Sequence, residues 1–198
     1  SNSGEIYYDS STGKLKAIEN NGAPQDIIKS ATTRNLNVME LSAAGLLPNI
    51  TGHTTTTLPD GYVLIVGGYN GSGHLSRAYL YDPNTNAVQL LENGPTYTRA
   101  YHTATLAQRS DGKWVVVIIG GLVNPANRLT TDEYYVVDER KFYTISGGAG
   151  VRYHTATLLK NNKILVCGGE SSPAGPPDNA TYLYDVNNDS RINVADSY

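Results

Sequence analysis

The chain has 198 residues, a net charge of −3 and a pI near 5.8. This length is enough for one domain with a real core or for two small ones. Basic residues do not cluster, so nucleic acid and anionic membranes are not expected as partners. No apolar run reaches the roughly 20 residues of a spanning helix, so we expect no membrane insertion. Tyrosine outnumbers phenylalanine by 15 to 1, which favours β-strands whose ring tips reach water or a polar partner.

The first predicted elements form a β-hairpin within residues 5–22, EIYYDSSTGKLKAIENNG. This stretch matches AYLYDPNTNAVQLLENGP, which begins at Ala78. Both stretches contain an aromatic strand, an aspartate, a polar turn and a second strand. Residues 23–50 have no counterpart further along the chain. We therefore expect residues 1–50 to hold a hairpin and a connecting segment, either as part of a repeat unit or as a linker.

A tandem repeat begins near residue 51 and is marked by His53, His102 and His154, which are 49 and 52 residues apart. Each histidine precedes a Thr-x-Thr-Leu segment whose alternation predicts a strand. A turn follows, and then an apolar strand, YVLIVGG, WVVVIIGG or KILVCGG. Such runs are typical of sheets that are covered on both faces. The strands end in the glycine pairs Gly67-Gly68, Gly120-Gly121 and Gly168-Gly169.

Two further strands complete each repeat: an aromatic one (RAYLYD, DEYYVVD or NATYLYD) and a last one such as AVQLLEN or KFYTISG. Four strands in about 50 residues indicate stacked or radial units. One four-stranded sheet cannot bury both of its faces, whereas sheets packed face to face around an axis can, as in a β-propeller. We predict an all-β fold with about three four-stranded blades, at residues 51–100, 101–152 and 153–198. The Thr-x-Thr-Leu segment is expected to be the innermost strand of each blade.

These features resemble kelch repeats. The resemblance rests on the glycine pair that closes the second strand, the tyrosine of LYD, and an arginine shortly before the next histidine. It covers about residues 53–198 and is strongest to bacterial repeats of the galactose-oxidase central-domain kind. The tryptophan typical of the last kelch strand is absent, and residues such as Val88 and Phe142 take its place. The resemblance implies a kelch-type β-propeller. The N-terminal hairpin also resembles hairpins of phage tail and fibre proteins.

Three blades and a partial blade do not close a ring, because propellers usually need four to eight blades. Sheets left open expose edges that invite pairing. Three explanations remain: the chain is a fragment of a longer one, other chains supply the missing blades, or copies of the chain assemble into a ring. We favour the fragment, and place partner chains second.

The repeated histidines and glycines are expected to be structural. Three histidines could hold a metal ion, but a repeat reuses its packing residues. We therefore expect each histidine to bond the backbone of a neighbouring turn and to fix the geometry between blades. The glycine pairs are expected to allow close approach or positive φ, not phosphate binding, because no helix follows them. Asp132 and Glu133, at the start of a strand, are expected to form a solvated edge.

One candidate metal site lies in DVNNDSRINVAD, residues 185–196. Side-chain oxygens at positions one, three, five, nine and twelve, with a backbone carbonyl at seven, match a calcium loop. The stretch resembles the first calcium loop of a dockerin, although Ser190 stands where the turn requires glycine. The alternative is an ordinary hairpin turn, as in the equivalent stretch AYLYDPNTNAVQL. The candidate calcium ligands are Asp185, Asn187, Asp189, Arg191, Asn193 and Asp196.

Variable loops carry the expected binding surface, because loops on a rigid scaffold carry recognition. Propeller loops gather at two faces. One set comprises residues 69–77, 122–130 and 170–179, and the other comprises residues 94–101 and 147–153. Their tyrosine, arginine and asparagine side chains suit contacts with a protein or a glycan. The candidate binding residues are Tyr69, Asn70, His74, Arg77, Tyr97, Arg99, Tyr101, Asn124, Asn127, Arg128, Arg152 and Tyr153.

These observations favour a binding or structural module over an enzyme. No nucleophile lies at a recognisable spacing from a base. Cys167, the single cysteine, lies in an apolar run typical of an inert core thiol. We expect a non-catalytic propeller without a cofactor other than calcium, extracellular or virion-associated, for example an adhesin. The alternatives are a sugar-acting enzyme of the kelch and galactose-oxidase-like group, since propellers assemble sites from distant loops, and a cytoplasmic adaptor.

Overall fold

Two compact units make up the chain, residues 1–43 and residues 44–198. No helix in the described part of the chain is long and apolar enough to cross a bilayer. The computed structural model describes residues 6–9, 14–18, 24–26, 47, 49–124, 127–148, 150–171 and 181–193.

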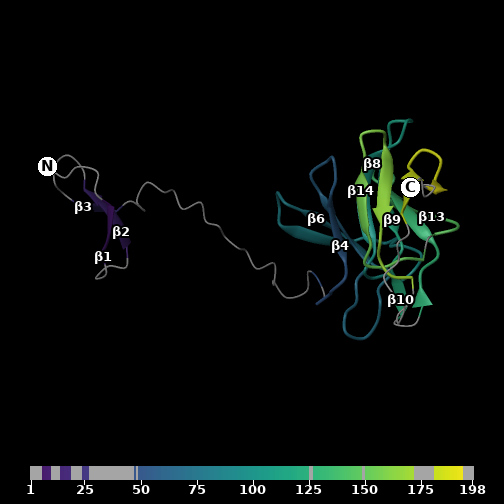
Figure 1. Cartoon of the computed structure of the whole chain (residues 1–198). Helices are drawn as coiled ribbons and strands as arrows, with labels where there is room; N and C mark the ends of the chain where they lie inside the picture. The colour runs from purple at the N-terminus through teal and green to yellow at the C-terminus, as the bar shows by residue number, and fades with distance from the viewer. Residues whose placement is uncertain are drawn as a thin grey trace. The chain divides into compact units, whose positions relative to one another are not determined.

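The first unit contains an antiparallel sheet of β1 (Ile6–Asp9), β2 (Lys14–Ile18) and β3 (Pro24–Asp26), in that order (Figure 1). β1 and β2 form the hairpin expected within residues 5–22. β3 lies in the segment that has no counterpart in the repeats, and it pairs with β2. The described strands are therefore a three-stranded meander, and β3 extends the hairpin by one strand.

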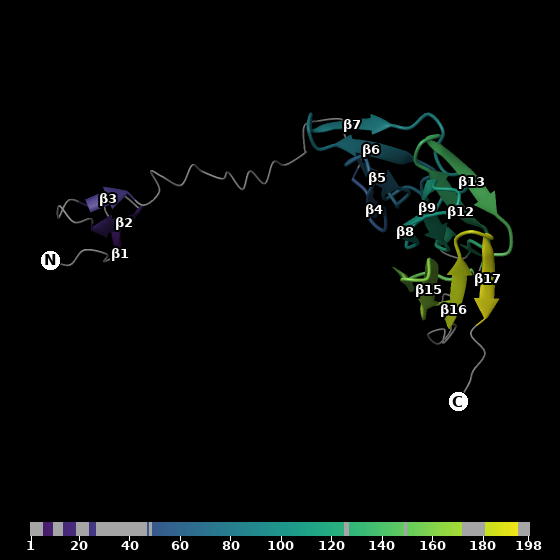
Figure 2. The same cartoon turned by 90° about the horizontal axis from the view of Figure 1, so that it is seen from above.

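The second unit contains three four-stranded antiparallel sheets in its described part, here called blades 1, 2 and 3 (Figures 1 and 2). Blade 1 consists of β4 (Thr54–Thr57), β5 (Val63–Val66), β6 (Ala78–Asp82) and β7 (Ala87–Leu90). Blade 2 consists of β8 (Thr103–Gln108), β9 (Trp114–Ile119), β12 (Asp132–Val136) and β13 (Lys141–Ile145). Blade 3 consists of β14 (Thr155–Leu158), β15 (Lys163–Cys167), β16 (Thr181–Asp185) and β17 (Ser190–Asn193). A short hairpin of β10 (Leu122–Asn124) and β11 (Asn127–Arg128) follows β9. The predicted all-β class and the four-stranded blades are confirmed.

The strands that follow the three histidines lie side by side. β8 contacts β4 on one side and β14 on the other. β7, β13 and β17 form the outer edges of their sheets (Figure 2). The Thr-x-Thr-Leu segments are thus the innermost strands, as the repeat predicts.

Two apolar cores join the blades through their faces. Leu64 of blade 1 packs in one core with Val116 of blade 2. Val117 of blade 2 packs in the other core with Ile164 of blade 3. Because neighbouring residues of β9 point to opposite faces, this strand contributes to both cores, and residues 115–119 are fully buried. The apolar run of β9 is explained by a sheet that has a partner on each face.

In blades 1 and 2, the first glycine of the pair leaves room for the chain that leads to the next blade. Gly67 and Gly120 have φ values of 66° and 63°. A Cβ atom at Gly120 would lie 2.0 Å from the carbonyl oxygen of Val151, and one at Gly67 would lie 2.3 Å from that of Arg99. The N–H of the following glycine, Gly121, donates to the same Val151 oxygen at 2.8 Å. The pair is therefore a docking point between blades, which agrees with its expected backbone role.

A pair of glycine-to-alanine variants separates this close approach from backbone strain. Gly112 also has a positive φ, 87°, but nothing lies within 4 Å of its Cβ position. Gly112→Ala should cost about 1–2 kcal/mol of unfolding free energy from strain alone. Gly120→Ala should cost about 1–3 kcal/mol more, because the Val151 segment must move. Urea denaturation measures both losses, and equal losses would contradict the docking role.

Candidate functional site

The predicted binding loops gather at one end of the blades. This doublet end is the end at which β5, β9 and β15 finish at their glycine pairs, and it includes β10 (Figure 1). Each blade has four antiparallel strands, so the chain enters and leaves a blade at this same end. The described parts of both loop sets therefore lie at the same end, and the expectation that the two sets gather at two different faces is wrong. Equivalent bridges tie the sets in each blade: Thr51 to Tyr69, Ala100 to Leu122, and Arg152 to Glu170.

A tyrosine stack runs across the doublet end. Gly52, Tyr101 and Tyr153 occupy the same position in the three blades, directly before the histidine, with φ values of 66°, 61° and 55°. The N–H of Tyr101 donates to the carbonyl of Gly52 at 2.8 Å, and the N–H of Tyr153 donates to that of Tyr101 at 3.2 Å. The ring of Tyr101 covers Gly52, and the rings of Tyr101 and Tyr153 are 4.8 Å apart. Tyr153 ends the stack and is 53% exposed.

A charged pair borders the exposed end of the tyrosine stack. The guanidinium of Arg152 lies 5.3 Å from the ring centroid of Tyr153 and 3.1 Å from the carboxylate of Glu170. Arg152 is mostly buried, whereas the side chain of Glu170 is 39% exposed. Burial raises the pKa of the Tyr153 hydroxyl, so this hydroxyl is a neutral donor and acceptor near pH 7. The stack thus presents an aromatic ring beside a carboxylate that faces solvent.

A hollow of about 370 Å³ lies beside the first step of the stack. The loop at its wall is shaped by Asn70, whose side-chain oxygen accepts from the N–H groups of Ser72 and Gly73 at 3.0 and 2.9 Å. The rings of Tyr69 and His74 are 5.3 Å apart, and burial lowers the pKa of His74. The hollow is lined by Asn49, Ile50, Thr51, Tyr69, Asn70 and Gly71.

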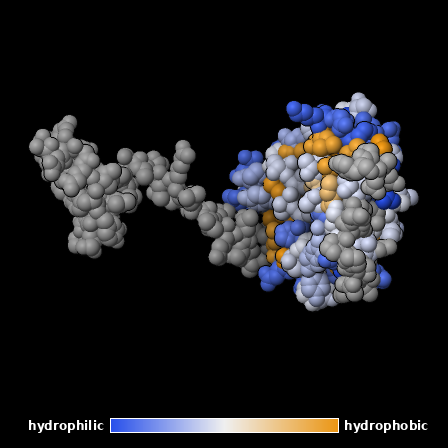
Figure 3. All heavy atoms as spheres, in the orientation of Figure 1, coloured by the Kyte–Doolittle hydropathy of each residue, from blue (hydrophilic) through white to orange (hydrophobic). Residues whose placement is uncertain are grey.

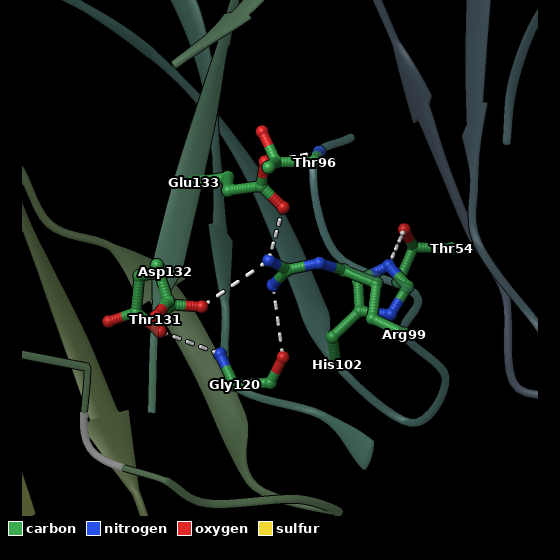
Figure 4. Close-up of polar contacts among 8 residues, drawn as sticks. All are labelled: Thr54, Thr96, Arg99, His102, Gly120, Thr131, Asp132 and Glu133. Carbon is green, nitrogen blue, oxygen red and sulfur yellow. Dashed lines mark hydrogen bonds and ion pairs between the residues drawn. The ribbon is translucent and has the colours of Figure 1, made fainter. Parts of the chain in front are cut away.

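Arg99 does not belong to the binding surface, because its side chain is fully buried. It donates to the carbonyl oxygens of Gly120 at 3.0 Å and Thr131 at 3.3 Å, and it pairs with the buried carboxylate of Glu133 (Figure 4). The other oxygen of Glu133 accepts from the N–H of Thr96 at 2.7 Å. Arg99 therefore fastens the segment between blades 1 and 2 to blade 2.

The solvated edge expected at Asp132 and Glu133 is also wrong, since both are buried. The carboxylate of Asp132 accepts from the N–H of Gly120 at 2.8 Å, and burial raises its pKa. The strand start lies under the crossing segment that carries Arg99, which removes both carboxylates from water. No pattern in the repeat indicates this, because the equivalent positions in blade 3 are Thr181 and Tyr182.

The other predicted binding residues have varied positions. Arg77 and Tyr97 are exposed at the doublet end. The side-chain oxygen of Asn124 accepts from the N–H of Asn127 at 2.9 Å, which closes the β10–β11 turn. The side chain of Arg128 lies outside the described residues, as do residues 172–179 of the third loop.

The histidines connect adjacent blades through threonine hydroxyls. Nε2 of His102 lies 2.8 Å from Oγ1 of Thr54, and Nε2 of His154 lies 2.8 Å from Oγ1 of Thr103. The inter-blade role holds for His102 and His154, but the partner is a side chain and not the turn backbone that we expected. Burial lowers the pKa of His102 well below its usual value and that of His154 to about 4. In the described part of the chain, no cluster of three His, Cys, Asp or Glu residues could hold a metal ion.

The candidate calcium loop forms the β16–β17 turn, and its carboxylates bind protein groups. Asp185 lies 2.5 Å from the ammonium of Lys163, and Asp189 lies 2.5 Å from the guanidinium of Arg109. The guanidinium of Arg191 donates to the carbonyl of Gly147. Asn187 accepts from the N–H of Ser110 at 2.8 Å. Asp196 and the side chain of Asn193 lie outside the described residues. Calcium binding stays a prediction. It would require Lys163 to release Asp185 and Arg109 to release Asp189.

Two glutamate variants test the buried Arg99–Glu133 pair. Glu133→Gln leaves the Arg99 charge buried without a counter-ion and should cost about 3–5 kcal/mol of unfolding free energy. Glu139→Gln is the matched control, because Glu139 pairs with Lys113 at the surface, where the two side chains are 34% and 50% exposed, and a surface pair contributes little. Urea denaturation compares them; similar losses would show that the pair does not hold the segment.

The buried histidines should make folding sensitive to acid. His154 titrates near 4 when folded and near 6.5 when unfolded. As the pH falls from about 6.5 to 4, the unfolded chain binds a proton that the folded chain does not, so stability decreases over that window. The NMR shift of the His154 Cε1 proton should stay constant from pH 7.5 to 5.5 in the folded protein. A midpoint near 6.5 would contradict the burial of its ring.

Comparisons with known proteins agree with this architecture. The kelch motif matches residues 51–93, which form blade 1 and the start of the segment after it. Over 107 residues the chain is 28% identical to the kelch repeat-containing protein kel-10 of Caenorhabditis elegans. This match covers 54% of the chain and 18% of that relative. The chain thus spans less than a fifth of the relative's length. The kelch motif in blade 1, the kelch-repeat relative and the three sheets that repeat the glycine pair thus agree with the predicted kelch-type repeats.

Proposed function

We propose that the chain is a non-catalytic binding module whose doublet end recognises a glycan. Kelch repeats generally mediate binding, and the tyrosine stack is the single observation that carries the choice of surface. An exposed tyrosine ring offers a flat apolar face to a ligand. Apolar surface that is left exposed to water often marks an interaction site. Tyr153 projects at the end of a stack whose backbone is fixed by hydrogen bonds between blades.

The polar groups beside the stack support a sugar as the ligand. The carboxylate of Glu170 is partly exposed and held by Arg152, so it accepts hydrogen bonds without changing position. The neutral tyrosine hydroxyl both donates and accepts. The hollow of about 370 Å³ at the Gly52 end of the stack lies within the size range of small-ligand pockets, roughly 300–1,000 Å³. A protein partner is the alternative, because exposed tyrosine and arginine are frequent in protein interfaces.

The proposal includes an extracellular or virion-associated setting, for example an adhesin. The resemblance of the N-terminal hairpin to hairpins of phage tail and fibre proteins supports this setting. The same setting suits a module that binds a surface glycan.

A glycan array tests the ligand and the surface together. The chain should bind a defined set of glycans, and Tyr153→Ala should weaken that binding at least about tenfold, as expected when a central aromatic contact is removed. Tyr143→Ala is the matched control, because Tyr143 is also exposed, at 38%, but lies on the outer strand of blade 2. It should leave binding unchanged.

Two results would change the proposal. If the wild-type chain binds no glycan on the array, the glycan is excluded and a protein partner is to be tested in its place. If Tyr143→Ala weakens binding as much as Tyr153→Ala, the doublet end is not the binding surface.

A further inference from the structure

The contact between adjacent blades has a direction. The following blade supplies the histidine ring and a carbonyl oxygen, and the preceding blade supplies the threonine hydroxyl and a glycine N–H. This arrangement occurs twice: His102 with Thr54, and His154 with Thr103. A blade therefore has a preceding face and a following face, and the two are not alike.

Blades 1 and 3, the first and last blades of the described residues, each carry one unused half of this contact. His53 begins blade 1 and is exposed, whereas His102 and His154 are only 5% and 6% exposed. Thr155 begins blade 3 and is also exposed. Its hydroxyl reaches only the carbonyl of Cys167 in its own sheet, at 3.5 Å. Within the described residues, blade 1 has the histidine and blade 3 has the threonine for one more contact of the same kind.

The following face of blade 3 has an apolar row that is partly open. Leu165, Leu183 and Ile192 lie opposite one another across β15, β16 and β17, and Ile192 is 42% exposed. The equivalent row of blade 2 includes Val117 and Tyr134, which pack in the core shared with blade 3. The row of blade 3 is thus of the kind that another blade covers.

The preceding face of blade 1 has the complementary row. Val63, Tyr81 and Val88 lie opposite one another across β5, β6 and β7, and all three are partly exposed. On the same face, Leu90 of β7 is 52% exposed. The equivalent row of blade 2, Val116, Tyr135 and Phe142, packs in the core shared with blade 1. Orange apolar patches also break the otherwise blue and white surface of this unit (Figure 3).

We infer that two copies of this chain join head to tail, the following face of blade 3 of each covering the preceding face of blade 1 of the other. His53 of one copy would then lie against Thr155 of the other, continuing the interface that the chain already uses twice. Because the described residues of one chain form three blades, two chains give a ring of six, within the range of four to eight blades that propellers use, whereas three chains exceed it. The ring covers the partly exposed apolar rows of both faces at once.

Sedimentation equilibrium of the 198-residue chain tests the inference. The expected mass is twice the 21.3 kDa of one chain. Ile192→Asp, on the following face, and Leu90→Asp, on the preceding face, should each give a monomer, because each places a charge in both interfaces of the ring. Leu158→Asp is the control: Leu158 is 40% exposed in blade 3 but pairs with Ile164, whose side chain faces blade 2. It should remain a dimer.

Mixing the two monomeric variants shows whether the faces are different. The Ile192→Asp chain keeps its preceding face and the Leu90→Asp chain keeps its following face, so the mixture should form a mixed dimer through one intact interface. Thermal melting of each variant checks that it is folded. A wild-type monomer at all concentrations overturns the inference. So does a mixture that stays monomeric, or either variant dimerising by itself. No glycan is present in these measurements, so they do not depend on the proposed function.

Discussion

The structure depends on a contact that blades 2 and 3 each make with the blade before them, between a neutral imidazole and a threonine hydroxyl. Water is excluded from the rings of His102 and His154, and their Nδ1 atoms are buried without a partner. An unpaired buried nitrogen costs free energy, and a charged one would cost much more. The apolar cores on either side of β9 offset that cost. The imidazole therefore sets the distance between innermost strands, while the cores supply the stabilisation.

The buried ion pair of Arg99 and Glu133 is a second kind of contact that joins adjacent blades, and it occurs between blades 1 and 2. The crossing segment between blades 2 and 3 has Val151 at the position of Arg99 and the third blade has Tyr182 at that of Glu133. A buried pair does not in itself add stability over apolar residues. The two Nη groups of Arg99 and the two carboxylate oxygens of Glu133 fix one arrangement of Gly120, Thr131 and Thr96 around the pair. We attribute to it the definition of the segment's path.

Much of the fold was predictable because the same four-strand pattern occurs three times in the sequence. The innermost strands, the apolar second strands and the glycine pairs follow from alternation and turn residues. The burial of Glu133 was not predictable, since its partner lies 34 residues away and only one repeat contains the pair. Tyr101 and Tyr153 were both candidate binding residues from the sequence, but their stacking was not predicted. It depends on the left-handed backbone conformation of the two residues. That conformation is unfavourable for tyrosine, so the residue type itself does not indicate it.

The directional contact also bears on how such a chain can change its length. Each blade carries, at its own histidine and threonine, both halves of the connection. If recombination removed blade 2, Thr54 would meet His154 with the same chemistry that now joins it to His102. If the segment for blade 2 were copied, the two copies would fit each other without a new surface. Gain or loss of a whole unit is therefore a conservative genetic event here, whereas a shift of a few residues within a strand would separate every ring from its hydroxyl.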